Sequence, residues 1–219
     1  MLRGSLVLLL ALTGCSAAPT VVDDPSPKVE RRTSLDPARG PESNGAPRRA
    51  LLTIPRLGIR DLPAVPYRGW TDDAPGTVIQ DRGVAASPFG PDGGVGPGGI
   101  GNYQVTAHRT SSTRAFANLP QLRRGDRVYV VAAGVRYVYE ITTTRSTSFR
   151  SARSLAEQRA AVPGKPGAPA TKAFLTLSTC ATPEDHAAGN YWSDEFHNPE
   201  HRIDKIGVLV SSRPVPARG

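Results

Sequence analysis

The stretch that decides the fold is Lys172–Cys180, whose sequence is KAFLTLSTC. Apolar and polar side chains alternate along it, which is typical of a β-strand with one face packed on a core. The alternation predicts that Thr176, Ser178 and Cys180 share one face, while the intervening leucines share the other. We therefore expect the thiol of Cys180 at the end of a strand, facing a polar groove to which Thr176 and Ser178 also contribute.

Similar short strands are predicted on both sides of this stretch, at 51–55, 77–79, 103–106, 127–133, 135–142 and 205–211. Ala133-Gly134 predicts a tight hairpin turn between two of them, and the glycine-rich segment 90–101 predicts an irregular loop. Helical patterns are weak, with a turn or two at 113–122 and a helix at 151–161. These features predict a mostly β domain, with about eight strands in a closed or half-closed barrel and short connecting helices.

The composition supports one domain of this kind. The chain has 219 residues, with 22 glycines and 21 prolines, which is more than a helical bundle would carry. Its 38% hydrophobic residues suffice for one core, which we place at 50–219. Only two cysteines are present, so a disulfide framework is excluded.

The N-terminus has the features of an export signal. A short basic start precedes the apolar run SLVLLLAL at 5–12, which is too short to span a bilayer, and the sequence LTGC ends at Cys15. This resembles a bacterial lipobox, so we expect a signal peptide at 1–15 and a lipid on Cys15. An ordinary signal peptide, or a signal-anchor truncated by a misassigned start, is the alternative. Residues 16–49 contain six prolines among mixed charges, which predicts a disordered tether. The expected location is the extracytoplasmic face of the membrane.

Export leaves Cys180 as an unpaired thiol outside the reducing cytosol, which makes it a candidate nucleophile. His108 ends the predicted strand near 103–106 and begins the pattern HR…F..L..L..GD over residues 108–126. Together with TLSTC at 176–180 and with Arg202 at the start of the last strand, this pattern resembles the sortase family of cell-surface cysteine transpeptidases. The resemblance covers about residues 51–210, and the proline-rich tether makes a class E-like member the nearest type.

The resemblance implies a closed sortase-like barrel and a role for each of three residues. Cys180 would be the nucleophile, His108 the general acid and base, and Arg202 the group that stabilises the oxyanion. The enzyme would cleave an LPxTG- or LAxTG-like sorting signal of exported proteins through a thioacyl-cysteine. It would then transfer them to an amine of a cell-wall precursor. No cofactor and no nucleic acid partner are expected.

The sequence departs from the family pattern after the cysteine, because Cys180 and Arg202 are 22 residues apart. This insert, 181–201, puts the arginine in doubt, since Lys205 or Arg213 could also approach the site. We expect Tyr191 and Trp192 in it to act as aromatic residues of a lid over the substrate groove. The insert also contains three histidines, which suggest a metal site, but Pro199 argues against a helix presenting two of them, so no metal is expected. The three are His186, His197 and His201.

Two other functions are compatible with the same sequence. The domain could be a non-catalytic lipoprotein on a sortase-like barrel. The net charge of +6 over residues 50–219, from 20 basic and 14 acidic residues, would then suit contact with anionic wall polymers. It could also be another exported Cys/His peptidase of the NlpC/P60-like type, although those enzymes carry their cysteine on a helix rather than on a strand.

Overall fold

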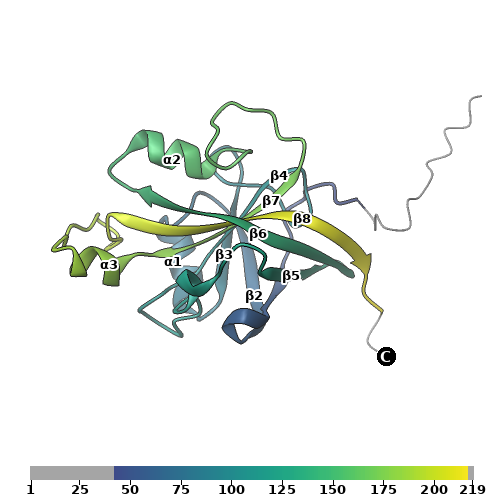
Figure 1. The fold of residues 1–219 in the computed structure, drawn as a ribbon, viewed down its shortest axis with the longest axis horizontal. Coiled ribbons are helices and arrows are strands. Elements are labelled where there is room, and N and C mark those ends of the chain that lie inside the picture. Colours follow the sequence, from purple (N-terminus) through teal and green to yellow (C-terminus); the bar gives the residue numbers. More distant parts are fainter. Residues whose placement is uncertain (1–41, 217–219) are drawn as a thin grey trace, which may run out of the picture. The chain divides into compact units, whose positions relative to one another are not determined.

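The computed structural model describes residues 42–216. The predicted signal peptide, the Cys15 site and most of the tether at 16–49 lie outside the described residues. The described part is a closed barrel with the strand order β1-β2-β3-β4-β7-β8-β6-β5 (Figure 1). The prediction of a mostly β domain with a closed barrel of eight strands and short helices is therefore confirmed.

The elements follow one another in chain order with short connections. The strands are β1 (Ala50–Ile54), β2 (Ile59–Arg68), β3 (Ala85–Phe89), β4 (Gly101–Thr106), β5 (Arg127–Ala132), β6 (Val135–Ser148), β7 (Ala173–Cys180) and β8 (His201–Pro214). The helices are α1 (Ala74–Asp81), α2 (Ala152–Arg159) and α3 (Thr182–Ala187), with 3₁₀ turns η1 (Pro55–Leu57) and η2 (Leu119–Gln121). None of the helices in residues 42–216 is long and apolar enough to cross a membrane.

The β5–β6 hairpin forms as predicted. Ala132 pairs with Val135, so Ala133 and Gly134 form a two-residue turn. Both turn residues have positive φ, 48° and 73°, which is the backbone that a type I′ turn requires. The helix predicted at 151–161 is also present, as α2, and begins with the side chain of Ser151 accepting a hydrogen bond from Ser154 N.

The strand predicted at 77–79 is wrong, because these residues lie in α1. The side chain of Asp73 accepts a hydrogen bond from Gly76 N at 2.8 Å, and Pro75 occupies the first turn of the helix. An N-cap and a proline in the first turn both favour a helix start, and they outweigh three β-favouring residues. Two strands were also missed, β2 and β3. The first contains Pro63 and Pro66, which weaken a strand pattern.

The core lies inside the barrel and fixes the position of β7. Leu175 and Leu177 are completely buried there, as the alternation predicts, and they pack in one cluster with Tyr103 and Val105 of β4. Burying a leucine side chain contributes about 1.5–3 kcal/mol. The pairing of β7 with β4 on one edge and β8 on the other therefore holds the last residue of β7 in place.

The ordered contacts of the domain begin before Ala50. Ser43 Oγ donates a hydrogen bond to the carbonyl of Pro97 at 2.6 Å, and Gly96 N donates one to the carbonyl of Gly45 at 2.7 Å. A side chain at Gly96 would collide with the carbonyl of Ala46, since its Cβ would lie 1.9 Å from that oxygen. The glycine-rich loop thus receives residues 43–46, which the sequence assigned to the tether.

Candidate active site

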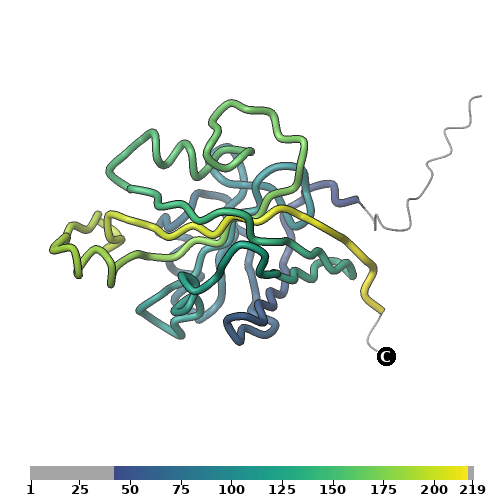
Figure 2. The backbone as a smooth tube through the Cα atoms, in the orientation of Figure 1, coloured from purple at the N-terminus to yellow at the C-terminus, as the bar shows by residue number. Residues whose placement is uncertain are grey.

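Cys180 and Arg202 meet at the end of two neighbouring strands. They are register partners in the antiparallel pair β7–β8, and β8 runs without interruption back to His201. In Figure 2 the two strands lie side by side, and α3 with the loop that follows it extends beyond their ends. Arg202 Nη1 donates a hydrogen bond to Cys180 Sγ. The long insert therefore leaves and returns to the sheet without separating these two residues.

Arg202 is completely buried and is held on several sides. Its Nη2 lies 2.6 Å from Asp72 Oδ2 and donates a hydrogen bond to Asn198 Oδ1 at 2.9 Å. Its guanidinium carbon lies 4.6 Å from the centre of the Phe149 ring, which is cation–π distance. A buried charge needs such partners, because its removal from water is costly. The contacts fix the orientation of the planar group relative to the sulfur.

Asp72, which the sequence did not single out, is the counter-charge of this arginine. Its Oδ1 accepts hydrogen bonds from Gln80 Nε2 at 2.8 Å and from Thr106 Oγ1 at 3.0 Å. Its backbone carbonyl accepts a third from Asn198 Nδ2 at 3.1 Å. The residue is buried, and its φ of 64° lies in the left-handed region. Only its proximity in the fold to the last strand shows that it belongs to the site.

The thiol of Cys180 is partly buried, and opposing effects act on its pKa. Burial raises the pKa, because it disfavours the charged thiolate. The positive charge of Arg202 lowers the pKa, while the negative charge of Asp72 raises it. The net shift is upward, so the resting group is a thiol next to a cation.

His108 lies just after β4, at the end of the barrel where Cys180 also lies. Its Nε2 is 2.8 Å from Oδ1 of Asp81, the last residue of α1. Within residues 42–216 the ring forms no hydrogen bond with Cys180. The imidazole is 16% exposed, so it borders solvent while one nitrogen is held by a carboxylate.

Arg109, the next residue, connects this segment to Cys180. Its Nη1 donates a hydrogen bond to the backbone carbonyl of Cys180 at 3.3 Å. Both of its Nη atoms also bind the carboxylate of Glu184 in α3, with the Nη2–Oε1 distance at 2.8 Å. This hydrogen bonding lowers the pKa of Glu184. The segment that carries His108 is thereby fixed against the end of β7 and the start of α3.

Thr176 and Ser178 lie on the opposite face of β7 from the two leucines, but they do not line an open groove. Both are buried, with Thr176 Oγ1 donating to Asn102 Oδ1 at 2.8 Å and Ser178 Oγ accepting from Gln158 Nε2 at 3.3 Å. Gln158 belongs to α2, which lies outside the barrel next to β6 in Figure 1. This burial corrects the expectation of an open polar groove along the strand, because α2 covers these positions.

The aromatic residues of the insert lie beyond α3. Tyr191 is 72% exposed and packs on the ring of His186 at a centroid distance of 4.8 Å. Trp192 lies 5.8 Å from the guanidinium carbon of Arg150. His201 Nδ1 lies 2.6 Å from Asp185 Oδ1, so this histidine has a carboxylate partner. No three potential metal ligands are grouped among the residues that the structure describes.

The two other cations considered from the sequence lie elsewhere. Lys205 is buried, and its Nζ donates to the carbonyls of Pro120 and Leu122 at 2.9 and 2.7 Å. Arg213 lies near the far end of β8, where it pairs with Arg136 of β6. Neither is bonded to the thiol. Of these three candidates, Arg202 is therefore the one bonded to the thiol of Cys180.

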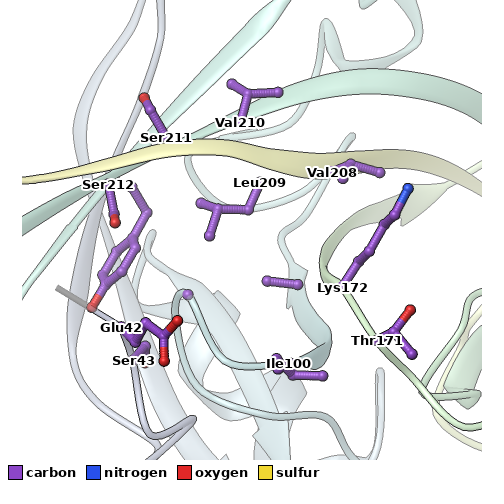
Figure 3. A pocket seen from close by; sticks show the side chains of 13 residues that line it. Glu42, Ser43, Ile100, Thr171, Lys172, Val208, Leu209, Val210, Ser211 and Ser212 are labelled. Carbon is purple, nitrogen blue, oxygen red and sulfur yellow. The ribbon is translucent and has the colours of Figure 1, made fainter. Parts of the chain in front are cut away.

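A hollow of about 560 Å³ lies at the opposite end of β7 from the thiol (Figure 3). Ile100, Lys172 and Leu209 line it, together with Glu42 from the docked N-terminal segment. Lys172 precedes the first residue of β7, whereas Cys180 is its last. The hollow therefore does not belong to the site around the cysteine.

A strand-borne cysteine beside a buried arginine, at the rim of a closed barrel, is an arrangement that can support nucleophilic chemistry. The family model described as "Sortase domain" matches residues 52–192, which is more than half of the chain. The chain belongs to the sortase family, whose members are cysteine transpeptidases of the cell surface. Sortases act on proteins that carry sorting signals and on amine acceptors of the cell wall.

Solved structures of sortases share the fold. The SrtA sortase from Actinomyces oris is 20% identical, with a TM-score of 0.58, and the match covers 84% of this chain and 90% of that one. Sortase E1 from Streptomyces coelicolor, solved with a tripeptide in its active site, is 22% identical, with a TM-score of 0.55 and coverage of 80% and 94%. Sortase E from Streptomyces avermitilis is 25% identical, with a TM-score of 0.55 and coverage of 78% and 93%. No curated protein matches the chain.

Proposed function

We propose that this sortase cleaves an LPxTG- or LAxTG-like sorting signal after its threonine and transfers the protein to a cell-wall amine. Cys180 forms the thioacyl intermediate, with His108 as general acid and base and Arg202 as oxyanion stabiliser. The observation that carries the proposal is the direct contact of Arg202 Nη1 with Cys180 Sγ in a buried, strand-paired arrangement. A fixed guanidinium next to the attacking sulfur is well placed for the oxygen of the scissile carbonyl.

The first half of the reaction forms the thioester. The sulfur attacks the threonine carbonyl carbon as His108 takes its proton, and the oxyanion that develops is stabilised by Arg202. His108 then gives the proton to the leaving amine, the carbon–nitrogen bond breaks, and the acyl group stays on Cys180. The raised pKa of the thiol supports a role for a base, because the thiolate is not the resting form.

The second half releases the enzyme. The acceptor amine attacks the thioester carbonyl, and His108 takes the proton of that amine. The carbon–sulfur bond then breaks, and His108 gives the proton to the leaving sulfur, which restores the thiol of Cys180. In the resting structure the ring is bound to Asp81, so we propose that it turns towards the substrate when the sorting peptide binds. The exposed position of Tyr191 supports the lid role that we propose for it and for Trp192.

The test is to trap the thioester. The full chain is incubated with LPxTG and LAxTG peptides, with and without an amine acceptor, and is analysed by intact-protein mass spectrometry. We expect an acyl adduct on Cys180 that the amine removes. Cys180→Ala should abolish the adduct and His108→Ala should nearly do so, whereas the matched control His186→Ala should retain it. A wild-type protein that forms no adduct with any such peptide is a binding protein or a different peptidase.

We also propose the cellular placement. Lipidation of Cys15 would hold the enzyme at the extracytoplasmic face of the membrane, where exported substrates emerge. Two acyl chains anchor a protein stably, because each buried CH₂ contributes about 0.8 kcal/mol. The class E-like assignment is supported by the fold shared with the two Streptomyces sortases.

A further inference from the structure

The geometry points to Asp72 as a positioning residue for the transpeptidation. Its carboxylate holds Arg202 by Nη2, so that Nη1 is directed at the reacting sulfur. This inference rests on the roles proposed above for Cys180 and Arg202, and it adds a residue from a distant part of the chain, the connection between β2 and α1.

Arg202 needs such a partner because of its length and its burial. An arginine side chain has several rotatable bonds, and a guanidinium without a counter-charge would be drawn towards water. Asp72 and Asn198 both bind Nη2, which leaves Nη1 for the sulfur. In the planar guanidinium, Nη2 thus fixes the position of the group, and Nη1 is left to contact the reacting sulfur.

The carboxylate of Asp72 is itself fixed from two elements. Gln80 of α1 and Thr106 of β4 both donate to Oδ1, so Oδ2 is left to face the arginine. Asn198 joins the two residues, because its amide donates to the carbonyl of Asp72 and accepts from Arg202. The left-handed backbone of Asp72, with φ of 64°, is strained for a non-glycine residue. Strain of this kind concentrates at functional sites.

The same carboxylate acts on the thiol. Its negative charge raises the pKa of Cys180, opposite to the effect of Arg202. Asp72 therefore has two measurable effects, one on the orientation of the arginine during the reaction and one on the protonation of the free cysteine. A residue with only a structural role would change neither the pH dependence of the thiol nor kcat selectively.

The experiment compares Asp72→Asn with the wild type in the full chain. Asparagine tolerates a positive φ, and its Oδ1 can still accept the two hydrogen bonds. Its Nδ2 then replaces the oxygen that faces Arg202, so the change removes both the charge and the acceptor that hold the arginine. The rate of Cys180 alkylation by iodoacetamide is measured from pH 5 to 10. We expect its midpoint to fall, because the negative charge of Asp72, which raises the pKa of the thiol, is removed.

Turnover of the sorting peptide is measured in parallel. We expect kcat to fall about 10- to 100-fold, because the arginine is no longer held in register, while KM changes less than about threefold. Asp73→Asn is the matched control. Asp73 caps α1 and touches neither Arg202 nor Cys180. Its kcat and KM should therefore stay within about twofold of the wild-type values, and its alkylation midpoint should not move.

An unmoved alkylation midpoint, or an unchanged kcat, overturns the proposal. If Asp72→Asn does not fold, Thr106→Val removes one of the two hydrogen bonds to Oδ1. It should lower kcat about threefold to tenfold at constant KM, and an unchanged kcat then overturns the proposal. A wild type that alkylates normally but turns over no peptide refutes the proposed function instead. In that case the alkylation midpoint of Asp72→Asn still tests whether Asp72 acts on the cysteine.

Discussion

Replacing Lys205 with methionine should weaken the barrel and leave the chemistry at Cys180 intact. Lys205 is 4% exposed, and its Nζ donates to two backbone carbonyls and to Thr144 Oγ1. Methionine fills similar volume, so the cost comes from acceptors that lose their donor, at about 1–3 kcal/mol each. Because the variant no longer buries an ammonium group, we expect a net loss of only about 2–4 kcal/mol.

The loss should also depend on pH. Burial lowers the pKa of Lys205 in the folded protein. Between that lowered pKa and the ordinary value of about 10.4, the unfolded state binds more protons than the folded state. Wild-type stability therefore gains a contribution that increases as pH rises through this window. Lys205→Met lacks this contribution, so the difference in stability between the two proteins should grow towards high pH.

Urea and thermal unfolding followed by tryptophan fluorescence, at several pH values from 7 to 10, measure both effects. At neutral pH the melting temperature should fall by about 2–4 °C for each kcal/mol lost. Lys172→Met, which changes an exposed lysine, is the control and should unfold like the wild type. If Lys205→Met keeps wild-type stability but loses more than about tenfold in turnover, Lys205 serves the oxyanion and the assignment of Arg202 is refuted.

Four further changes test other parts of the structure. Arg109→Met should lower kcat about tenfold, because it removes the hydrogen bond to the carbonyl of Cys180. Glu184→Gln should lower the free energy of unfolding by less than about 1 kcal/mol, since half of that carboxylate side chain is exposed. Equal kinetic effects of the two changes would contradict this reasoning. Cys15→Ser should release the protein from sedimented membranes or block its processing; a variant that stays on the membrane at the wild-type mature mass excludes lipidation and favours a truncated signal-anchor. Simultaneous replacement of the three insert histidines should leave turnover within about tenfold, and complete loss that zinc or calcium restores would reveal a metal site at His186, His197 and His201.

The sequence was most informative where the structure depends on the pattern of neighbouring residues. The alternation in β7 places two leucines in the core, and the Ala133-Gly134 pair forms its hairpin, because both features need only neighbouring residues. The residues at 77–79 have the composition of a strand, but the N-cap Asp73 and Pro75 in the first turn favour a helix there. Attention to Asp73 and Pro75 would have found it.

Asp72 and the burial of Ser178 could not be found in this way. Asp72 is 130 residues from Arg202 in sequence, and no local pattern distinguishes it from the neighbouring Asp73. The hydroxyl of Ser178 is polar and on the predicted face, but α2 covers it through Gln158, which is 20 residues away. Both facts come from packing between distant elements.

The pairing of β4 with β7 has a consequence for how the enzyme comes into being. These strands run parallel, with Gly101 opposite Ala173, so their ladder closes a loop of about 70 residues. Contacts at such separation must be made against loop-closure entropy, and they slow folding relative to local contacts. Cys180 on β7 gains its contact with Arg202 only when β8, the last strand within residues 42–216, joins the ladder. Until the barrel closes, Cys180 lacks its contact with Arg202, and a chain that stops before β8 lacks the proposed transpeptidase site.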